Sequence, residues 1–143
     1  MPRKDDFDLH AFLPYLLNQA AEASSLGFQA SYKGRYGMLR TDWRVLFHLG
    51  IHGRMTAKDI GERAKIHKTK VSRAVQRLAD RRFLTRERDE ADRRSEFLEL
   101  TQAGQAAYRD LRAIAQEYEA RLTAQFSAEE TALLKRLLVE LAR

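Results

Sequence analysis

The sequence predicts a mainly α-helical fold with a small β-sheet of two or three strands. The chain has 143 residues, the usual size of one compact domain, and only two prolines and seven glycines, so long helices are permitted. Apolar residues recur at helical spacing over most of its length, whereas two short segments within residues 83–100 favour strands. Its 44% hydrophobic and 32% charged residues fit a folded globular protein.

The composition excludes several classes of protein. The chain contains no cysteine, which excludes disulfide scaffolds, thiol nucleophiles, thiolate metal sites and cysteine redox sensors. No apolar run reaches the roughly 18 residues that a membrane span needs, and the first residues lack the apolar core of a signal peptide. We therefore expect a cytoplasmic protein without membrane contact. No glycine-rich phosphate loop and no pair of nucleophile and base indicates an enzyme, so we expect neither catalytic residues nor cofactors.

The N-terminal part of the chain is expected to be helical. Its apolar side chains follow the spacing of an amphipathic helix at Leu9, Phe12, Leu13, Leu16, Leu17 and Ala20. Pro14 leaves two alternatives, because the main helix either starts beside it, with the proline in the first turn, or is kinked there. Residues 31–40 contain Gly34 and Gly37 and predict a loop.

Three helices are expected in the middle of the chain. Thr41 can cap the first helix, which ends near Gly50 and Gly53. Thr56 can cap a short second helix, and a tight connection leads from it to a third helix near residues 68–81. Two short helices joined by such a turn, the second of them basic, indicate a helix-turn-helix.

The third of these helices has an apolar and a polar side. The apolar side is formed by Val71, Ala74, Val75 and Leu78. The other side carries residue types that contact base edges and phosphates, and its candidate DNA-contacting residues are Lys68, Thr69, Lys70, Ser72, Arg73, Gln76 and Arg77. The alternative is an ordinary amphipathic surface helix.

A β-hairpin is expected directly after this helix. Segments 83–86 and 96–100 have the composition of short strands, and the residues between them are mostly charged. This arrangement predicts a wing with a charged tip, so residues 41–100 together predict a winged helix-turn-helix lobe. The alternative for the tip is an exposed turn whose surface ion pairs contribute little to stability.

The excess positive charge lies in the same segment. The chain has 26 Lys and Arg against 20 Asp and Glu, a net charge of +6. Residues 54–86 alone hold 11 basic and 3 acidic side chains, a net +8, whereas the residues outside 40–100 sum to zero. A basic stretch inside a foldable region is typical of nucleic-acid binding, although a solvated surface of lysines and arginines gives the same count.

The C-terminal part predicts two more helices and a second role. Thr101 can cap a long helix to about Gln125, and Ser127 with Glu130 forms a capping box for the last one. The helices at both ends carry more apolar faces than a winged lobe of about 60 residues can cover. We therefore expect a homodimer, although these helices could instead pack on their own domain.

The expected dimer gives a division of the single domain 1–143. Residues 7–32 and 102–143 would be dimerisation helices, on either side of a DNA-binding lobe at residues 41–100. The candidate interface residues are Phe12, Leu16, Leu134, Leu137, Leu138 and Leu141.

Four segments carry a resemblance to a known family. Residues 39–46, 70–78, 89–94 and 100–104 are similar, in register, to the second helix, recognition helix, wing and wing exit of the MarR family of bacterial transcriptional regulators. The chain departs from the family at Arg82, because glycine is common where the recognition helix ends. If the backbone is left-handed there, the arginine is strained by roughly 1 kcal/mol.

The resemblance implies a homodimeric regulator of double-stranded DNA, usually a repressor, that binds a pseudo-palindromic operator. It implies a DNA-contacting wing in which Arg94 enters the minor groove and Asp92 orients it by a charge-assisted bond. The wing residues concerned are Arg88, Asp92, Arg93 and Arg94. A non-specific, chromosome-associated winged-helix protein remains the alternative, since non-specific binding needs only phosphate contacts.

The resemblance also implies an effector pocket, because many members of the family bind small phenolic or anionic ligands. The residues concerned combine aromatic rings with basic groups: His10, Tyr15, Tyr36, Arg40, Trp43 and Phe47. The alternative is that they belong to the core or the dimer interface. His48 and His52 have the spacing of paired metal ligands, but no cysteine or acidic cluster completes a site, so no metal is expected.

Overall fold

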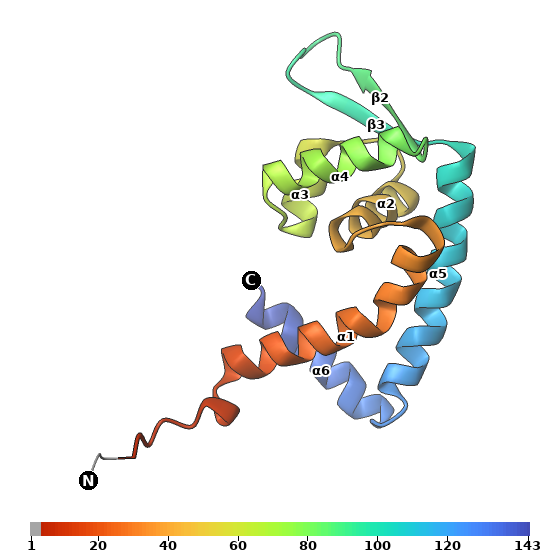
Figure 1. Cartoon of the computed structure of the whole chain (residues 1–143). Helices are drawn as coiled ribbons and strands as arrows, with labels where there is room; N and C mark the ends of the chain where they lie inside the picture. The colour runs from red at the N-terminus through yellow and green to blue at the C-terminus, as the bar shows by residue number, and fades with distance from the viewer. Residues whose placement is uncertain (1–3) are drawn as a thin grey trace.

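The structure is a computed structural model that describes residues 4–143. Its elements confirm the mainly α-helical fold with a small sheet (Figure 1). In chain order they are η1 (Leu9–Ala11), α1 (Leu13–Tyr36), α2 (Arg40–His52), β1 (Met55–Thr56), α3 (Ala57–Ala64), α4 (Lys68–Asp80), β2 (Leu84–Arg88), β3 (Glu96–Leu100), α5 (Gln102–Thr123) and α6 (Ala128–Leu141). Within these residues, no helix combines the length and the hydropathy that crossing a membrane requires.

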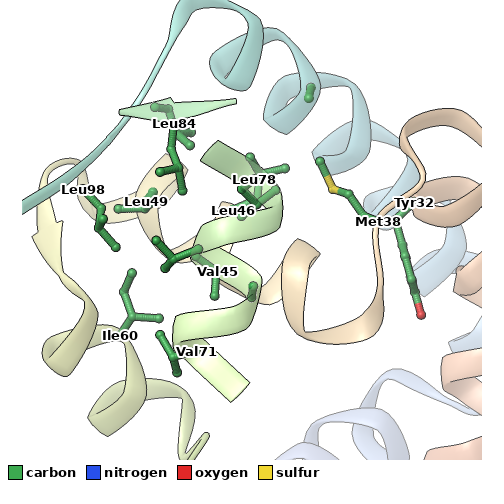
Figure 2. Close-up of a cluster of buried hydrophobic side chains, with 14 of the residues drawn as sticks. Tyr32, Met38, Val45, Leu46, Leu49, Ile60, Val71, Leu78, Leu84 and Leu98 are labelled. Carbon is green, nitrogen blue, oxygen red and sulfur yellow. The ribbon is translucent and has the colours of Figure 1, made fainter. Parts of the chain in front are cut away.

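The elements divide into two regions. Helices α2, α3 and α4 gather beneath the hairpin β2–β3, while α1, α5 and α6 form the opposite end, and α5 connects the two (Figure 1). Buried aliphatic side chains from α2, α3, α4 and the sheet form the core of the first region (Figure 2). They include Val45, Leu46, Leu49, Ile60, Val71, Leu78, Leu84 and Leu98.

The sheet has three antiparallel strands in the order β1-β3-β2. Strand β2 pairs with β3 from Leu84 opposite Leu100 to Arg88 opposite Glu96, which confirms the predicted hairpin. Its first strand starts one residue later and ends two residues later than the predicted segment 83–86. Strand β1 has only two residues, Met55 and Thr56, paired with β3. A strand of this length has no periodicity of its own and depends on its partner strand.

The predicted helix starts are confirmed where they depend on local capping. Pro14 lies in the first turn of α1, so the first of the two alternatives is correct. The hydroxyls of Thr56, Thr101 and Ser127 each accept the N–H three residues later, at 3.1, 3.1 and 3.0 Å. Glu130 also returns a bond to the Ser127 N–H at 2.9 Å, which completes the capping box.

The predicted loop over residues 31–40 is wrong. Helix α1 continues to Tyr36, and only three residues separate it from α2. Tyr32 is 2% exposed in the core, so tertiary packing holds this last part helical despite Gly34. The helix ends at Gly37, whose φ of 63° is left-handed and suits a residue without a side chain.

The predicted ends of α2 also need correction. Thr41 does not cap it, because Leu39 is the N-cap and donates its N–H to the carboxylate of Asp42 at 2.9 Å. Gly50 lies inside the helix, where the ring of Tyr108 occupies the place that a side chain would fill. Only Gly53, with φ 79°, ends α2.

Candidate nucleic-acid interface

Helix α4 is held to the core by its apolar side. Its four predicted core residues are all buried, which confirms the assignment of the two faces. Lys65 adopts φ 55° and ends α3, and the ring of His67 accepts the N–H of Thr69 at 3.2 Å to cap α4. The tight turn of the predicted helix-turn-helix therefore depends on a left-handed lysine and a histidine cap, and neither residue type is a usual signal for such a turn.

A groove of about 840 Å³ lies between α3, α4 and the wing. It brings Lys68 and Ser72 of α4 together with the predicted wing residues. Cationic side chains outnumber acidic ones in its lining. The cationic ones are Lys58, Lys68, Arg86, Arg88, Arg93 and Arg94. Thr69, Lys70 and Arg73 are exposed on α4 outside this lining.

Arg77 bonds inside the protomer. It donates to the carboxylate of Asp42 through Nε at 3.0 Å and through Nη2 at 2.8 Å. Asp42 is 2% exposed, and its hydrogen bonds to the guanidinium raise the pKa of Arg77. The structure thus places Arg77 in a contact between α2 and α4. Asp42 is the one acidic residue among the buried side chains of α2, and a buried carboxylate requires a cationic partner. This feature of the sequence could have indicated the ion pair.

The tip of the wing is organised by two aspartates. The carboxylate of Asp92 accepts the backbone N–H of Arg94 at 3.1 Å and the hydroxyl of Ser95 at 3.4 Å, and Asp89 similarly binds the N–H of Ala91. Asp92 therefore shapes the backbone of the turn, whereas the implied bond to the Arg94 side chain is not formed. Within residues 4–143, Arg88, Arg93 and Arg94 form no salt bridge.

The six implied pocket residues do not gather in one pocket. The rings of His10 and Tyr15 are 5.8 Å apart at the start of α1, and Arg40 pairs with Glu22 of α1 at 3.4 Å. Trp43 and Phe47 meet at 5.2 Å in an aromatic cluster that also contains Phe28, Tyr32, Tyr108 and Tyr118. Phe47 alone of the six lines a second groove of about 600 Å³, between α2 and α5.

Tyr36 has a different environment. Its hydroxyl donates to Asp110 at 2.6 Å, and Arg35 donates to the same carboxylate at 2.9 and 3.1 Å. Burial and the bond to Asp110 raise the pKa of Tyr36, and that bond lowers the pKa of Asp110. These contacts join the end of α1 to α5.

The two histidines of α2 lie close together, with ring centroids 6.1 Å apart. The Nδ1 atom of His48 is 2.8 Å from the carbonyl oxygen of Arg44 and is occupied by the helix itself. Across residues 4–143, no three His, Asp or Glu side chains gather in a way that could hold a metal ion.

Comparisons with known proteins match part of the chain to one family. A sequence model described as the MarR family matches residues 36–95. Over 132 residues, the chain is 29% identical to the homoprotocatechuate degradative operon repressor of Escherichia coli, covering 92% of this chain and 88% of that protein. Residues 36–95, which hold helices α2 to α4 and most of the wing, thus match the MarR family. The members of this family are transcriptional regulators and not enzymes, and the E. coli relative is named as a repressor.

Solved structures of similar fold cover nearly the whole chain. A probable transcriptional regulator from Pseudomonas aeruginosa superposes with a TM-score of 0.84 at 27% identity, covering 94% of this chain and 99% of that one. The structure of NadR in complex with 4-hydroxyphenylacetate gives a TM-score of 0.77 at 26% identity, covering 100% and 99% of the two chains.

Proposed function

We propose that this MarR-family chain is a homodimeric repressor that binds a pseudo-palindromic operator. The observation that carries the proposal is the basic groove in which α4 and the wing present their cations together. A helix that offers hydroxyls and arginine beside a wing that offers further arginines can contact base edges in the major groove and phosphates and the minor groove at its flanks. The E. coli relative is itself named as an operon repressor.

We assign the DNA contacts to two groups of residues. The N-terminal half of α4 would enter the major groove with Lys68, Thr69, Lys70, Ser72 and Arg73. The wing would reach the adjoining minor groove with Arg88, Arg93 and Arg94, none of which is committed to a salt bridge within residues 4–143. Residues 41–100 form the DNA-binding lobe in this proposal.

The dimer is supported by apolar side chains that the single chain leaves exposed. Helix α6 buries none of its residues. Leu134, Leu137, Leu138 and Leu141 are between 42% and 55% exposed, and Phe12 and Leu16 are each 44% exposed. Apolar surfaces of this extent normally mark an interface, so we assign residues 7–32 and 102–143 to dimerisation.

We further propose a phenolic carboxylate as the effector that releases the repressor from DNA. NadR is described in complex with 4-hydroxyphenylacetate, and the name of the E. coli relative concerns homoprotocatechuate, which is also a phenolic arylacetate. In this chain Arg40 and Trp43 are three positions apart on α2, so a cation and an aromatic ring share one side of that helix. These are the groups that a phenolic carboxylate requires.

The proposal is tested by binding to the DNA upstream of the chain's own gene. A gel-shift titration at fixed salt, with excess random-sequence competitor, is expected to retain a discrete complex that 4-hydroxyphenylacetate dissociates. Arg94→Ala is expected to weaken the complex about tenfold, whereas Arg121→Ala, on the far part of α5, leaves it unchanged. Loss of all binding to the competitor would instead support the non-specific DNA-binding protein, and an unresponsive complex would reject this effector class alone.

A further inference from the structure

One guanidinium joins the wing to helix α4. Arg86 of β2 donates from Nε and Nη2 to Oε2 of Glu96 on β3, at 2.9 and 2.7 Å. Its Nη1 donates to Oε1 of Gln76 on α4 at 2.7 Å. The Nε2 of Gln76 in turn donates to Asp80, one helical turn later, at 2.7 Å. The side chains of Gln76, Asp80, Arg86 and Glu96 therefore form a joint that links both strands of the wing to the helix.

We propose that Arg86 is a positioning residue that fixes the angle between the wing and α4, and that Gln76 belongs to this joint instead of reading a base. This inference rests on the proposed function, because it concerns how the two DNA-contacting parts are held relative to each other. It reassigns one residue, Gln76, that the sequence places on the DNA-facing side.

The geometry of the guanidinium supports the first half of the proposal. The donors of an arginine lie in one rigid plane, so a carboxylate bound along one edge fixes the direction of the remaining donor. In Arg86, Glu96 occupies the Nε and Nη2 edge, and Nη1 then points to Gln76. A lysine, whose ammonium is a point charge, cannot fix both directions.

The state of the Gln76 amide supports the second half. Arginine can only donate and an ionised aspartate can only accept, so the amide oxygen must face Arg86 and the amide nitrogen must face Asp80. A bidentate contact to adenine uses the same oxygen and nitrogen and requires the amide to turn its edge toward the base. The bonds to Arg86 and Asp80 already fix the orientation of the Gln76 amide and use one lone pair and one N–H, so the amide is not free to turn toward a base.

Arg86 lies near the base of the wing, so a change there would move the wing tip. Leu84, two residues before it, is buried in the core, and Arg88, two residues after it, forms the last pair of the strand ladder. Arg86 therefore lies where the hairpin leaves the lobe, and the tip projects beyond it (Figure 1). Its side chain and that of Glu96 are each 32% exposed, so the pair is partly shielded from water. A small rotation here displaces Arg93 and Arg94 by much more.

Arg54 provides a matched control. It also pairs with a glutamate of the wing, Glu87, at 2.9 Å and lies over the ring of Phe97 at 4.4 Å. This pair joins the residue before β1 to β2 and has no hydrogen bond to α4 in residues 4–143. Removing it changes the local charge by the same amount without touching the joint.

The first test needs no DNA and uses the absence of cysteine in the chain. Cysteines introduced at Glu90 in the wing tip and Glu62 on α3 carry spin labels, and the distance between them is measured in the full-length protein. We expect a narrow distribution in the parent and Arg54→Ala, and a distribution at least twice as wide in Arg86→Ala, Arg86→Lys and Gln76→Ala. Equal widths in all variants would overturn the proposal, whatever the protein binds.

The second test uses the operator. Hydroxyl-radical footprints of Arg86→Ala and Gln76→Ala are expected to lose the flanking protection given by the wing, with about tenfold weaker binding and unchanged base preference under α4. Arg86→Lys should behave like Arg86→Ala. If the lysine variant keeps full affinity, Arg86 is a phosphate contact, and if Gln76→Ala relaxes the preference at one base pair, Gln76 reads that base. Either result rejects the joint, and absence of any specific footprint in the parent rejects the proposed function instead.

Discussion

At the scale of single residues, Arg82 shows a conflict between side chain and backbone. Its φ is 65°, and the turn after α4 needs that value, because the N–H of Arg82 reaches Ala79 and the N–H of Phe83 reaches Leu78, both at 2.9 Å. The carbonyl oxygen of Arg82 accepts the Thr101 hydroxyl at 2.7 Å. The sequence predicts strain at Arg82 only if its backbone is left-handed. The observed φ is left-handed, so the arginine is strained by roughly 1 kcal/mol.

Arg82→Gly should therefore raise the free energy of unfolding by about 1 kcal/mol, because glycine adopts a positive φ without steric cost. The measurement is urea denaturation followed by circular dichroism. Arg82→Ala is the control, since it removes the same charge but keeps a side chain at φ 65°. A gain of equal size in both variants would mean that charge repulsion, and not backbone strain, destabilises the turn.

The candidate site could be predicted only as far as the direction in which side chains point. Helical periodicity correctly separates Val71 and Leu78 from the outward side of α4, because the spacing of a helix is local. It could not show that Arg77 and Gln76 have partners inside the protomer, because Asp42 and Arg86 come from other elements. Such partners depend on the tertiary fold, which the spacing of one helix does not contain.

At the scale of elements, some helix ends are set by local sequence and others by tertiary contacts. The N-caps at Thr101 and Ser127 were predictable, because each needs only residues within one turn. The end of α1 was not, because Tyr36 and Arg35 are held by Asp110 of α5, about 75 positions later in the chain. Glycine signals a helix end only where no such contact opposes it.

The start of α5 provides a prediction at this scale. Gly104 is buried, and a Cβ there would lie 2.0 Å from the carbonyl oxygen of Phe83. Gly104→Ala should therefore lower the free energy of unfolding by about 1–3 kcal/mol through overpacking, as measured by thermal and urea denaturation. Gly34→Ala in α1 is the matched control, because nothing lies within 4 Å of the added Cβ.

That control should move in the opposite direction. Alanine in an open helical position is expected to stabilise the protein by about 0.5–1 kcal/mol relative to glycine. If both substitutions stabilise, α5 can shift away from Phe83, and the close approach that joins α5 to the end of α4 is not a fixed feature of the fold. If both destabilise, Gly34 has a packing role that its open surroundings do not explain.

At the scale of the whole molecule, charge and apolar surface are separated. The net +8 of residues 54–86 lies on the lobe with the groove, whereas the residues outside 40–100 carry no net charge and include the exposed leucines of α6. A neutral, apolar end favours self-association, and a basic end favours DNA. Each end thus suits one half of the proposed function, and the dimer would place two basic lobes at a fixed spacing.

The dimer gives the last prediction. Leu134 and Leu138 lie one turn apart on α6 and are 44% and 42% exposed, so the double substitution to aspartate places two charges in the proposed interface without opening the core. We expect light scattering to change from twice the chain mass of 16.6 kDa in the parent to one chain mass in the variant. Operator affinity should fall by roughly 100-fold or more, because one lobe then binds one half-site alone.

The matched control is Ile51→Asp, which places the same charge on a residue that is 61% exposed on α2, outside the proposed dimerisation helices. It should remain dimeric and keep its operator affinity. Circular dichroism must show the parent's helix content in both variants, since a dimer lost through unfolding would say nothing of the interface. A parent that scatters as a single chain, or a double variant that remains a dimer, would show that the exposed leucines of α6 do not hold two chains together.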